Sequence, residues 1–254
     1  SGPFWQPGSL VLRGAKSGFG RCGPGRGGFG WNGVVEFWLF FPERTMDRFL
    51  LLDNRDSFTY NLRAWVLKAG YQCRVVDHHQ GPEAWEAWSW DAAILGPGPG
   101  TPPKAGRLMS FVDRYAEEKP LLGICLGHQA LGLKAGAQLV HASAPVHGKR
   151  SFLRWDRSMC DLFQHNYNSK FTQFEGGQVM RYHSLVLDRV PETYQLLATA
   201  SDDGTIQVMR HRSRPLWGYQ FHPESITTDS SQAWLQLFVE NALHPKPLSL
   251  KSFS

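Results

Sequence analysis

The chain of 254 residues lacks paired cysteines, long apolar runs and, over most of its length, a surplus of charge of one sign. Its four cysteines form no Cys-x-x-Cys pair, so neither a disulfide framework nor a zinc site is indicated, and a reducing compartment fits best. The longest apolar stretch, Val34–Phe41, is short and contains Glu36, which excludes a membrane span. Residues 1–45 carry three of the five net positive charges. The rest is close to neutral, which argues against nucleic-acid binding.

Residues 1–45 show neither helical nor strand periodicity, and they hold 11 of the 26 glycines. Backbone entropy on this scale opposes ordering, so we expect a disordered extension, followed by a domain over residues 46–244 and a tail, 245–254. Met46 stands just before the first apolar run, which fits a start site set too far upstream. A transit segment and an RNA-binding tail resting on Arg21–Gly30 are the alternatives. We expect a cytoplasmic location, and the extension leaves an organellar one open.

Short apolar runs alternate with segments of helical spacing from Arg48 onward. This alternation predicts an α/β fold with an open, mostly parallel sheet and helices on both faces. The expected helices include one with Ser57 as its N-cap and Gly70 as its stop. Four strands and a closing helix are expected in the last hundred residues. The expected elements are strands Phe49–Leu52, Cys73–Val76, Ala92–Leu95, Pro120–Ile124, Gln178–Tyr182, Tyr194–Ala200, Thr205–His211 and Leu216–Phe221, and helices Glu83–Trp90, Leu108–Glu118, Leu126–Ala135 and Ser231–Leu243.

Cys125 stands in the sharpest motif, Gly123-Ile124-Cys125-Leu126-Gly127-His128-Gln129, where an expected strand runs directly into an expected helix. Gly-x-Cys-x-Gly is the nucleophile-elbow pattern with cysteine in place of serine, and its glycines permit a tight, strained turn. The turn would set the sulfur at a helix N-terminus, where the helix dipole favours the thiolate. The backbone N–H of Leu126 would point toward an oxyanion. We interpret Cys125 as a nucleophile, with a buried structural cysteine as the alternative.

A thiol nucleophile needs a base and a group that orients the base. His222 and Glu224 stand two residues apart just after an expected strand. In extended geometry both side chains leave on the same side, so the carboxylate can hold the imidazole tautomer. Without the cysteine motif, the same pair would indicate only a solvated strand end.

Two further segments are candidates for substrate contacts. The Gly- and Pro-rich loop Leu95–Pro102 follows an expected strand, so it lies at the carboxyl edge of the sheet, where open α/β folds bind ligands. It is not a phosphate loop, because no Gly-Lys-Ser/Thr follows it. Tyr182-His183-Ser184-Leu185 is the other segment, although a lone histidine such as His183 is more often structural.

Six motifs occur in order along the chain, namely Asp53–Leu62, Gly98–Pro102, Gly123–Gln129, His147–Lys149, Arg181–Leu185 and Gln220–Ser225. Together they resemble the class I (triad) glutamine amidotransferases, and more narrowly the small subunit, component II, of anthranilate synthase or aminodeoxychorismate synthase. The resemblance covers about Met46–Leu243 and implies a flavodoxin-like fold. Arg150–Met180 is longer and less similar than the family pattern, so contacts from that segment are left open. Residues 1–45 have no family counterpart.

The resemblance implies that Cys125 is the nucleophile, His222 the base and Glu224 the group that orients it. It implies no metal and no cofactor in this chain, because Mg²⁺ and chorismate would belong to a partner subunit. The positions that match the family's contacts to glutamine and its oxyanion are Gly98, Pro99, Gly100, Leu126, Gln129, Ser184 and Leu185.

The activity implied by the resemblance is hydrolysis of L-glutamine through a cysteine thioester, with ammonia delivered to a chorismate-binding synthase component I as heteromeric partner. No nucleic-acid or membrane partner is implied, and the anthranilate and aminodeoxychorismate pathways both stay open. The alternatives are a stand-alone Cys-His-Glu γ-glutamyl hydrolase or peptidase and a non-catalytic regulatory subunit. Arg55 and Asp56, with His183 and Ser184, are expected to transmit partner binding to the glutamine site. Capping of the helix near Ser57 is the competing interpretation for Asp56.

Overall fold

The computed structural model describes residues 47–157 and 177–245. The expectations for residues 1–45, for the tail beyond residue 245 and for part of Arg150–Met180 therefore lie outside the described residues. Within the described ranges, no helix combines the length and the apolar composition that a bilayer crossing needs.

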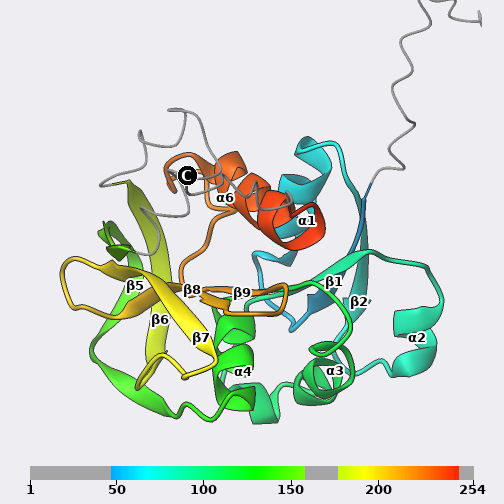
Figure 1. The fold of residues 1–254 in the computed structure, drawn as a ribbon, viewed down its shortest axis with the longest axis horizontal. Helices are drawn as coiled ribbons and strands as arrows, with labels where there is room; N and C mark the ends of the chain where they lie inside the picture. The colour runs from blue at the N-terminus through cyan, green and yellow to red at the C-terminus, as the bar shows by residue number, and fades with distance from the viewer. Residues whose placement is uncertain (1–46, 158–176, 246–254) are drawn as a thin grey trace, which may run out of the picture. The chain divides into compact units, whose positions relative to one another are not determined.

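One mixed sheet organises the described residues in the strand order β2-β1-β3-β4-β9-β8-β7-β5-β6 (Figure 1). The first five strands in this order pair in parallel and the remaining pairs are antiparallel. The expected open, mostly parallel sheet with helices is confirmed, and an antiparallel extension follows its last parallel strand. The strands are β1 (Arg48–Asp53), β2 (Gln72–Asp77), β3 (Ala92–Leu95), β4 (Leu121–Ile124), β5 (Leu139–Trp155), β6 (Gln178–Leu187), β7 (Tyr194–Ala200), β8 (Ile206–His211) and β9 (Leu216–Tyr219).

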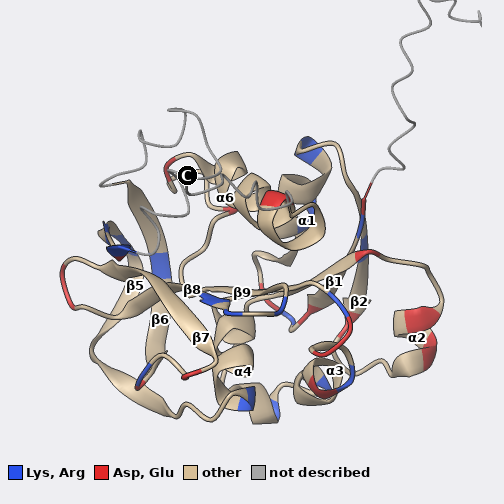
Figure 2. Cartoon of the chain, in the orientation of Figure 1, with Lys and Arg blue, Asp and Glu red and all other residues tan. Residues whose placement is uncertain are grey.

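Helices cover both faces of the parallel strands, and each face has its own apolar core (Figure 1). Side chains alternate along a strand, so in β1 Leu51 enters the core under α1 and α6, while Leu50 and Leu52 enter the core over α3 and α4. Figure 2 shows acidic and basic residues interspersed over these elements. The helices are α1 (Thr59–Lys68), α2 (Pro82–Glu86), the 3₁₀ helix η1 (Pro102–Lys104), α3 (Leu108–Tyr115), α4 (Leu126–Lys134), α6 (Ser231–Phe238) and the π-helix η3 (Val239–Leu243).

The start of α1 corrects the expected N-cap. The helix begins at Thr59 behind Phe58, and Ser57 does not cap it. The Phe58 N–H instead donates to Asp56 Oδ1 (2.8 Å), and the Thr59 hydroxyl donates to Asp53 Oδ1 (2.6 Å). The N-cap position thus lies one residue later than the pattern indicated, and no side chain caps the helix; the two carboxylates that precede it fix the turn that leads into it.

The end of α1 follows the expectation. Gly70 has a φ of 89°, its N–H donates to the Leu67 carbonyl (3.0 Å), and the next N–H, of Tyr71, reaches the Val66 carbonyl (3.4 Å). Helices commonly end in this way, with a glycine in the left-handed conformation just after the last turn.

Strand β5 was not expected from the sequence. It runs for 17 residues and pairs with β6 across two register irregularities, one of them beside Gly148, whose φ is 64°. Most of its side chains are exposed, so it lacks the alternation that reveals a half-buried strand. Its partner β6 extends past the expected end at Tyr182 to Leu187. The expected substrate residues Ser184 and Leu185 therefore lie on a strand.

Candidate active site

Cys125 lies at a strained turn between β4 and α4, with a φ of 51° and a ψ of −100°. Two glycines make this turn possible. A Cβ on Gly123 would lie 2.4 Å from the Gly127 carbonyl oxygen, and one on Gly127 would lie 2.2 Å from the Leu95 oxygen. Backbone strain concentrated at one residue of a strand-to-helix turn is the geometry of a nucleophile elbow.

His222 and Glu224 form a buried pair just beyond β9. Nδ1 of His222 lies 2.7 Å from Oε1 of Glu224, and both side chains are at most 2% exposed. Because a carboxylate can only accept a hydrogen bond, Nδ1 of His222 carries a proton and donates it to Glu224. The other ring nitrogen, Nε2, is left to contact the sulfur of Cys125. The backbone N–H of His222 donates to the Met180 carbonyl (2.9 Å), and its carbonyl accepts from the Thr228 hydroxyl (2.7 Å). Both ends of the residue are therefore fixed to neighbouring segments.

The charge balance around His222 favours its protonated form. Burial opposes a charged imidazole, but the carboxylate of Glu224 and the hydrogen-bonding contact with Cys125 outweigh it, so the pKa of His222 is raised well above its usual value. An imidazole that holds a proton readily beside a thiol suits the transfer of a proton away from the sulfur.

A pocket of about 170 Å³ opens beside Cys125. Seven of its lining residues are Cys125 and the glutamine contacts implied by the resemblance, and the other two, Tyr182 and His183, belong to the candidate segment Tyr182–Leu185. Leu126 does not line it, although its side chain packs against Gly98, where a Cβ would lie 2.9 Å from Leu126 Cδ2. The lining residues are Gly98, Pro99, Gly100, Cys125, Gln129, Tyr182, His183, Ser184 and Leu185.

Asn54 holds the glycine loop on one side of this pocket. Its Nδ2 donates to the Gly96 carbonyl (2.7 Å), and a Cβ on Gly98 would lie 2.6 Å from Asn54 Cβ. The motif Asp53–Leu62 contains Asn54 but indicates no role for it, because Asn54 follows β1 and meets the loop after β3 only through the parallel pairing of the two strands.

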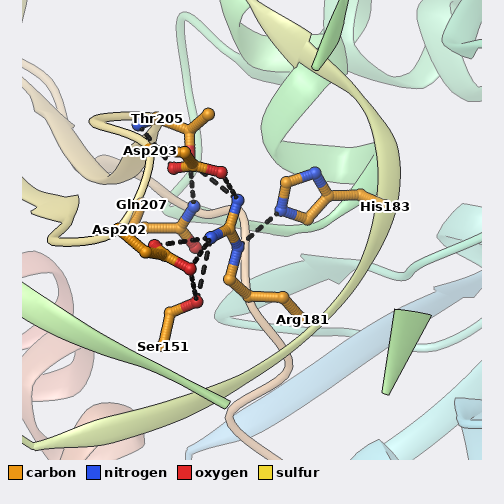
Figure 3. Close-up of polar contacts among 7 residues, drawn as sticks. All are labelled: Ser151, Arg181, His183, Asp202, Asp203, Thr205 and Gln207. Carbon is orange, nitrogen blue, oxygen red and sulfur yellow. Dashed lines mark hydrogen bonds and ion pairs between the residues drawn. The ribbon is translucent and has the colours of Figure 1, made fainter. Parts of the chain in front are cut away.

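Arg181 supports the opposite wall of the pocket (Figure 3). Its guanidinium is fully buried and ties β6 to β5 and to the turn between β7 and β8. Its Nε donates to Nε2 of His183 (3.1 Å), so the His183 proton sits on Nδ1. Burial, with Arg181 adding repulsion, lowers the pKa of His183 to about 4. The other acceptors of Arg181 are Ser151 Oγ (2.9 Å), Asp202 Oδ1 (3.0 Å), Asp203 Oδ2 (2.5 Å) and Thr205 Oγ1 (2.9 Å).

Arg55 and Asp56 form hydrogen bonds away from the pocket. Arg55, at a φ of 61°, pairs through Nε with Asp77 on β2 (3.0 Å), and Asp56 accepts from Phe58 as described above. The contact between this loop and the site runs through Phe58, whose ring centroid lies 5.0 Å from that of Tyr182 and 5.1 Å from that of His222. The structure thus does not bring Arg55 and Asp56 to His183 and Ser184.

Comparison with known proteins agrees with this architecture. Residues 50–242 match the family described as glutamine amidotransferase class-I, and the chain belongs to that family. It is 38% identical to anthranilate synthase component 2 of Thermus thermophilus, over 78% of this chain and 94% of that protein. It is 41% identical to aminodeoxychorismate synthase of Streptomyces griseus, over 75% of this chain but only 25% of that longer protein. A Thermoplasma acidophilum protein provisionally described as a GMP synthase subunit shares the fold, at 22% identity and a TM-score of 0.63, over 76% of this chain and 92% of its own.

Proposed function

We propose that this chain hydrolyses L-glutamine and passes the ammonia to a synthase partner that aminates chorismate. Three properties support the proposal: the family, the names of the two relatives, and a thiol that lines the pocket and contacts a buried histidine-carboxylate pair behind it. The single observation that carries it is the buried His222–Glu224 contact of 2.7 Å next to Cys125. Chorismate and Mg²⁺ are assigned to the partner, and the chain itself is proposed to need no cofactor.

The reaction begins at Cys125. His222 accepts the thiol proton, and the sulfur adds to the side-chain carbonyl of glutamine. His222 then returns the proton to the leaving nitrogen, so ammonia departs and a γ-glutamyl thioester remains. Water, deprotonated by His222, attacks the thioester and releases glutamate and the thiol. Glu224 keeps the imidazole in one tautomer throughout and stabilises its charged form.

The tetrahedral intermediates carry a negative oxygen that needs donors. Backbone N–H groups of Gly98–Gly100 and of Leu126 are proposed for this role, since the loop lines the pocket and Leu126 opens α4 directly after the nucleophile. One such donor contributes about 3–4 kcal/mol at comparable sites. Gln129, Ser184 and Leu185 are proposed to bind the rest of the glutamine molecule.

The test is Cys125→Ser in the full chain assembled with a chorismate-binding synthase subunit. Glutamine-dependent synthesis should fall at least about a thousandfold, whereas synthesis supplied with ammonium should stay near the wild-type rate, because only ammonia production uses the thiol. If both activities fell together, glutamine hydrolysis and synthesis would not be separate sites. Rapid glutamine hydrolysis by the wild-type chain that is unchanged by the partner would instead indicate a stand-alone hydrolase.

A further inference from the structure

Gln220 is a fully buried amide between β9 and His222, and the mechanism above does not use it. Its Nε2 donates to the sulfur of Cys125 at 3.6 Å, and its Oε1 accepts from Nε2 of Gln129 at 3.2 Å. Its backbone N–H donates to the Gln207 carbonyl of β8 (2.9 Å), which fixes the residue in the sheet. One side chain therefore joins the nucleophile to the wall of the pocket.

The orientation of the Gln220 side-chain amide follows from the hydrogen bonds that Gln129 makes beyond it. The Leu185 carbonyl can only accept, so the group that Gln129 presents to it at 3.0 Å is its NH₂. The same NH₂ contacts Gln220, which must therefore present its oxygen to Gln129. The NH₂ of Gln220 is then left for the sulfur. Cys125 accordingly faces a donor, and an N–H donor binds a thiolate more strongly than a neutral thiol.

We propose that Gln220 is a catalytic residue that stabilises the thiolate of Cys125 through its side-chain N–H. At neutral pH an ordinary cysteine is mostly protonated, so a buried donor at the sulfur increases the reactive fraction. His222 takes the proton, and Gln220 holds the resulting negative charge in place. The inference rests on the proposed function only in naming Cys125 as the nucleophile.

The experiment measures the reactivity of the sulfur without glutamine or a partner. The full chain is treated with iodoacetamide at pH 7, and modification of Cys125 is followed by peptide mass spectrometry. Gln220→Leu, which keeps the size but removes the donor, should slow alkylation of Cys125 at least about tenfold. Cys73 serves as the reference within each sample, because burial raises its pKa to about 11 and its slow rate should not change.

A matched control is available on the neighbouring strand. Gln207 is equally buried, but its side-chain NH₂ donates to the Thr205 hydroxyl (2.9 Å) and not to sulfur. Gln207→Leu makes the same substitution in the same sheet and should leave the alkylation rate of Cys125 at the wild-type value. Equal slowing in both variants would show a general loosening of the core and would overturn the proposal.

Gln220→Glu separates the donor from the rest of the contact. It keeps an oxygen for Gln129 and replaces the donor to sulfur with a second oxygen, so alkylation should slow at least as much as in Gln220→Leu. A wild-type alkylation rate in either folded variant overturns the proposal. If neither variant folds, the side-chain amide proton resonances of Gln220 are compared between the wild-type chain and Cys125→Ala. They are expected further upfield in Cys125→Ala, which lacks the sulfur, and unchanged resonances would overturn the proposal.

The two proposals fail in different ways. If wild-type Cys125 alkylates rapidly and the Gln220 variants slow it, but no glutamine is hydrolysed, the thiolate inference stands and the proposed function falls. If glutamine is hydrolysed and the Gln220 variants alkylate normally, only the role of Gln220 is wrong. In active protein, loss of the donor should lower kcat for glutamine more than it changes KM.

Discussion

The two walls of the pocket are built on opposite physical principles. The wall that carries Cys125 belongs to the parallel strands, whose cores are almost wholly apolar, and glycines let its backbone segments approach closely. The wall that carries Ser184 and Leu185 belongs to the antiparallel strands, and it rests on the buried charge of Arg181. Close contact between backbone segments fixes the position of the first wall, and hydrogen bonds to the buried guanidinium of Arg181 fix the position of the second.

This difference predicts different failures. A side chain added at the elbow has no way to be accommodated, because the neighbouring atoms are backbone. A defect in the Arg181 cluster leaves Cys125 in place but releases β6, the strand that carries the proposed glutamine contacts. The first should abolish chemistry and the second should weaken binding.

The largest effect is expected for Gly127→Val. Its Cβ would lie 2.2 Å from the Leu95 oxygen, so β3 and α4 must separate. We expect a loss of more than ~3 kcal/mol in the free energy of unfolding and of more than ~100-fold in glutaminase kcat, because the nucleophile would move. Chemical denaturation measures the free energy of unfolding, and glutamine hydrolysis measures kcat.

Gly70→Ala is the control, since no atom lies within 4 Å of its Cβ. It should cost ~1–2 kcal/mol of stability and leave kcat unchanged. Normal activity in Gly127→Val would contradict the steric account.

Arg181→Met should come next. In the wild type the guanidinium of Arg181 helps to lower the pKa of Asp203, although burial opposes this shift. Removing the guanidinium leaves the Asp203 carboxylate without its buried partner. Loss of one member of a fully buried pair costs about 3–5 kcal/mol, and because the Asp203 side chain is 15% exposed we expect the lower end of that range. Because β6 carries Ser184 and Leu185, KM for glutamine should rise more than kcat falls. Alkylation of Cys125 by iodoacetamide should remain within about twofold of wild type, and a larger loss there would show that the two walls are not independent.

The pH dependence of stability tests the buried histidines on both sides of the site, His183 on β6 and His128 on α4. Burial lowers the pKa of His183 to about 4 and that of His128 to about 3, whereas an unfolded histidine titrates near 6.5. The unfolded chain therefore binds more protons, and the free energy of unfolding falls as the pH drops from about 6.5 to 4, by up to ~1.4 kcal/mol per pH unit for each histidine. His222 has a raised pKa, so its stabilising contribution is fully present below about pH 6 and adds almost nothing to this pH dependence.

His183→Gln isolates one of these contributions. Urea denaturation at pH 6.5, 5.5 and 4.5 should give a shallower loss of stability than in the wild type, by up to ~1.4 kcal/mol per pH unit. Glutamine keeps an acceptor for Arg181 Nε, so the fold should survive. Parallel slopes in the two proteins would mean that His183 is not held neutral.

The smallest effect is expected for Asp56→Ala. Its hydrogen bond to the Phe58 N–H stays within the loop before α1, so its loss should cost ~1 kcal/mol of stability. Stimulation of glutaminase by the synthase partner should be unchanged. A tenfold weaker stimulation, equal to ~1.4 kcal/mol of coupling, would instead support a role of Asp56 in transmitting partner binding.

The sequence by itself determined the features that depend on neighbours in the chain. Gly123 and Gly127 flank Cys125 within one turn, and His222 stands two residues from Glu224, so their geometry follows from local backbone conformation. The alternation of strands and helices likewise predicted the sheet and its helical cover. The local pattern was wrong at one point, because α1 begins at Thr59 without a side-chain cap, and Asp53 and Asp56 rather than Ser57 hold the turn before it.

Only the tertiary structure decided which distant residues meet. Gln220 reaches Cys125 because β9 pairs with β4, and Gln129 reaches Leu185 because α4 lies against β6. The long strand β5 was invisible, since its exposed side chains carry no period, and its partner β6 places His183 beside Arg181. The hydrogen bonds of these buried polar groups are formed by segments that come together only on folding, and no spacing in the sequence specifies them.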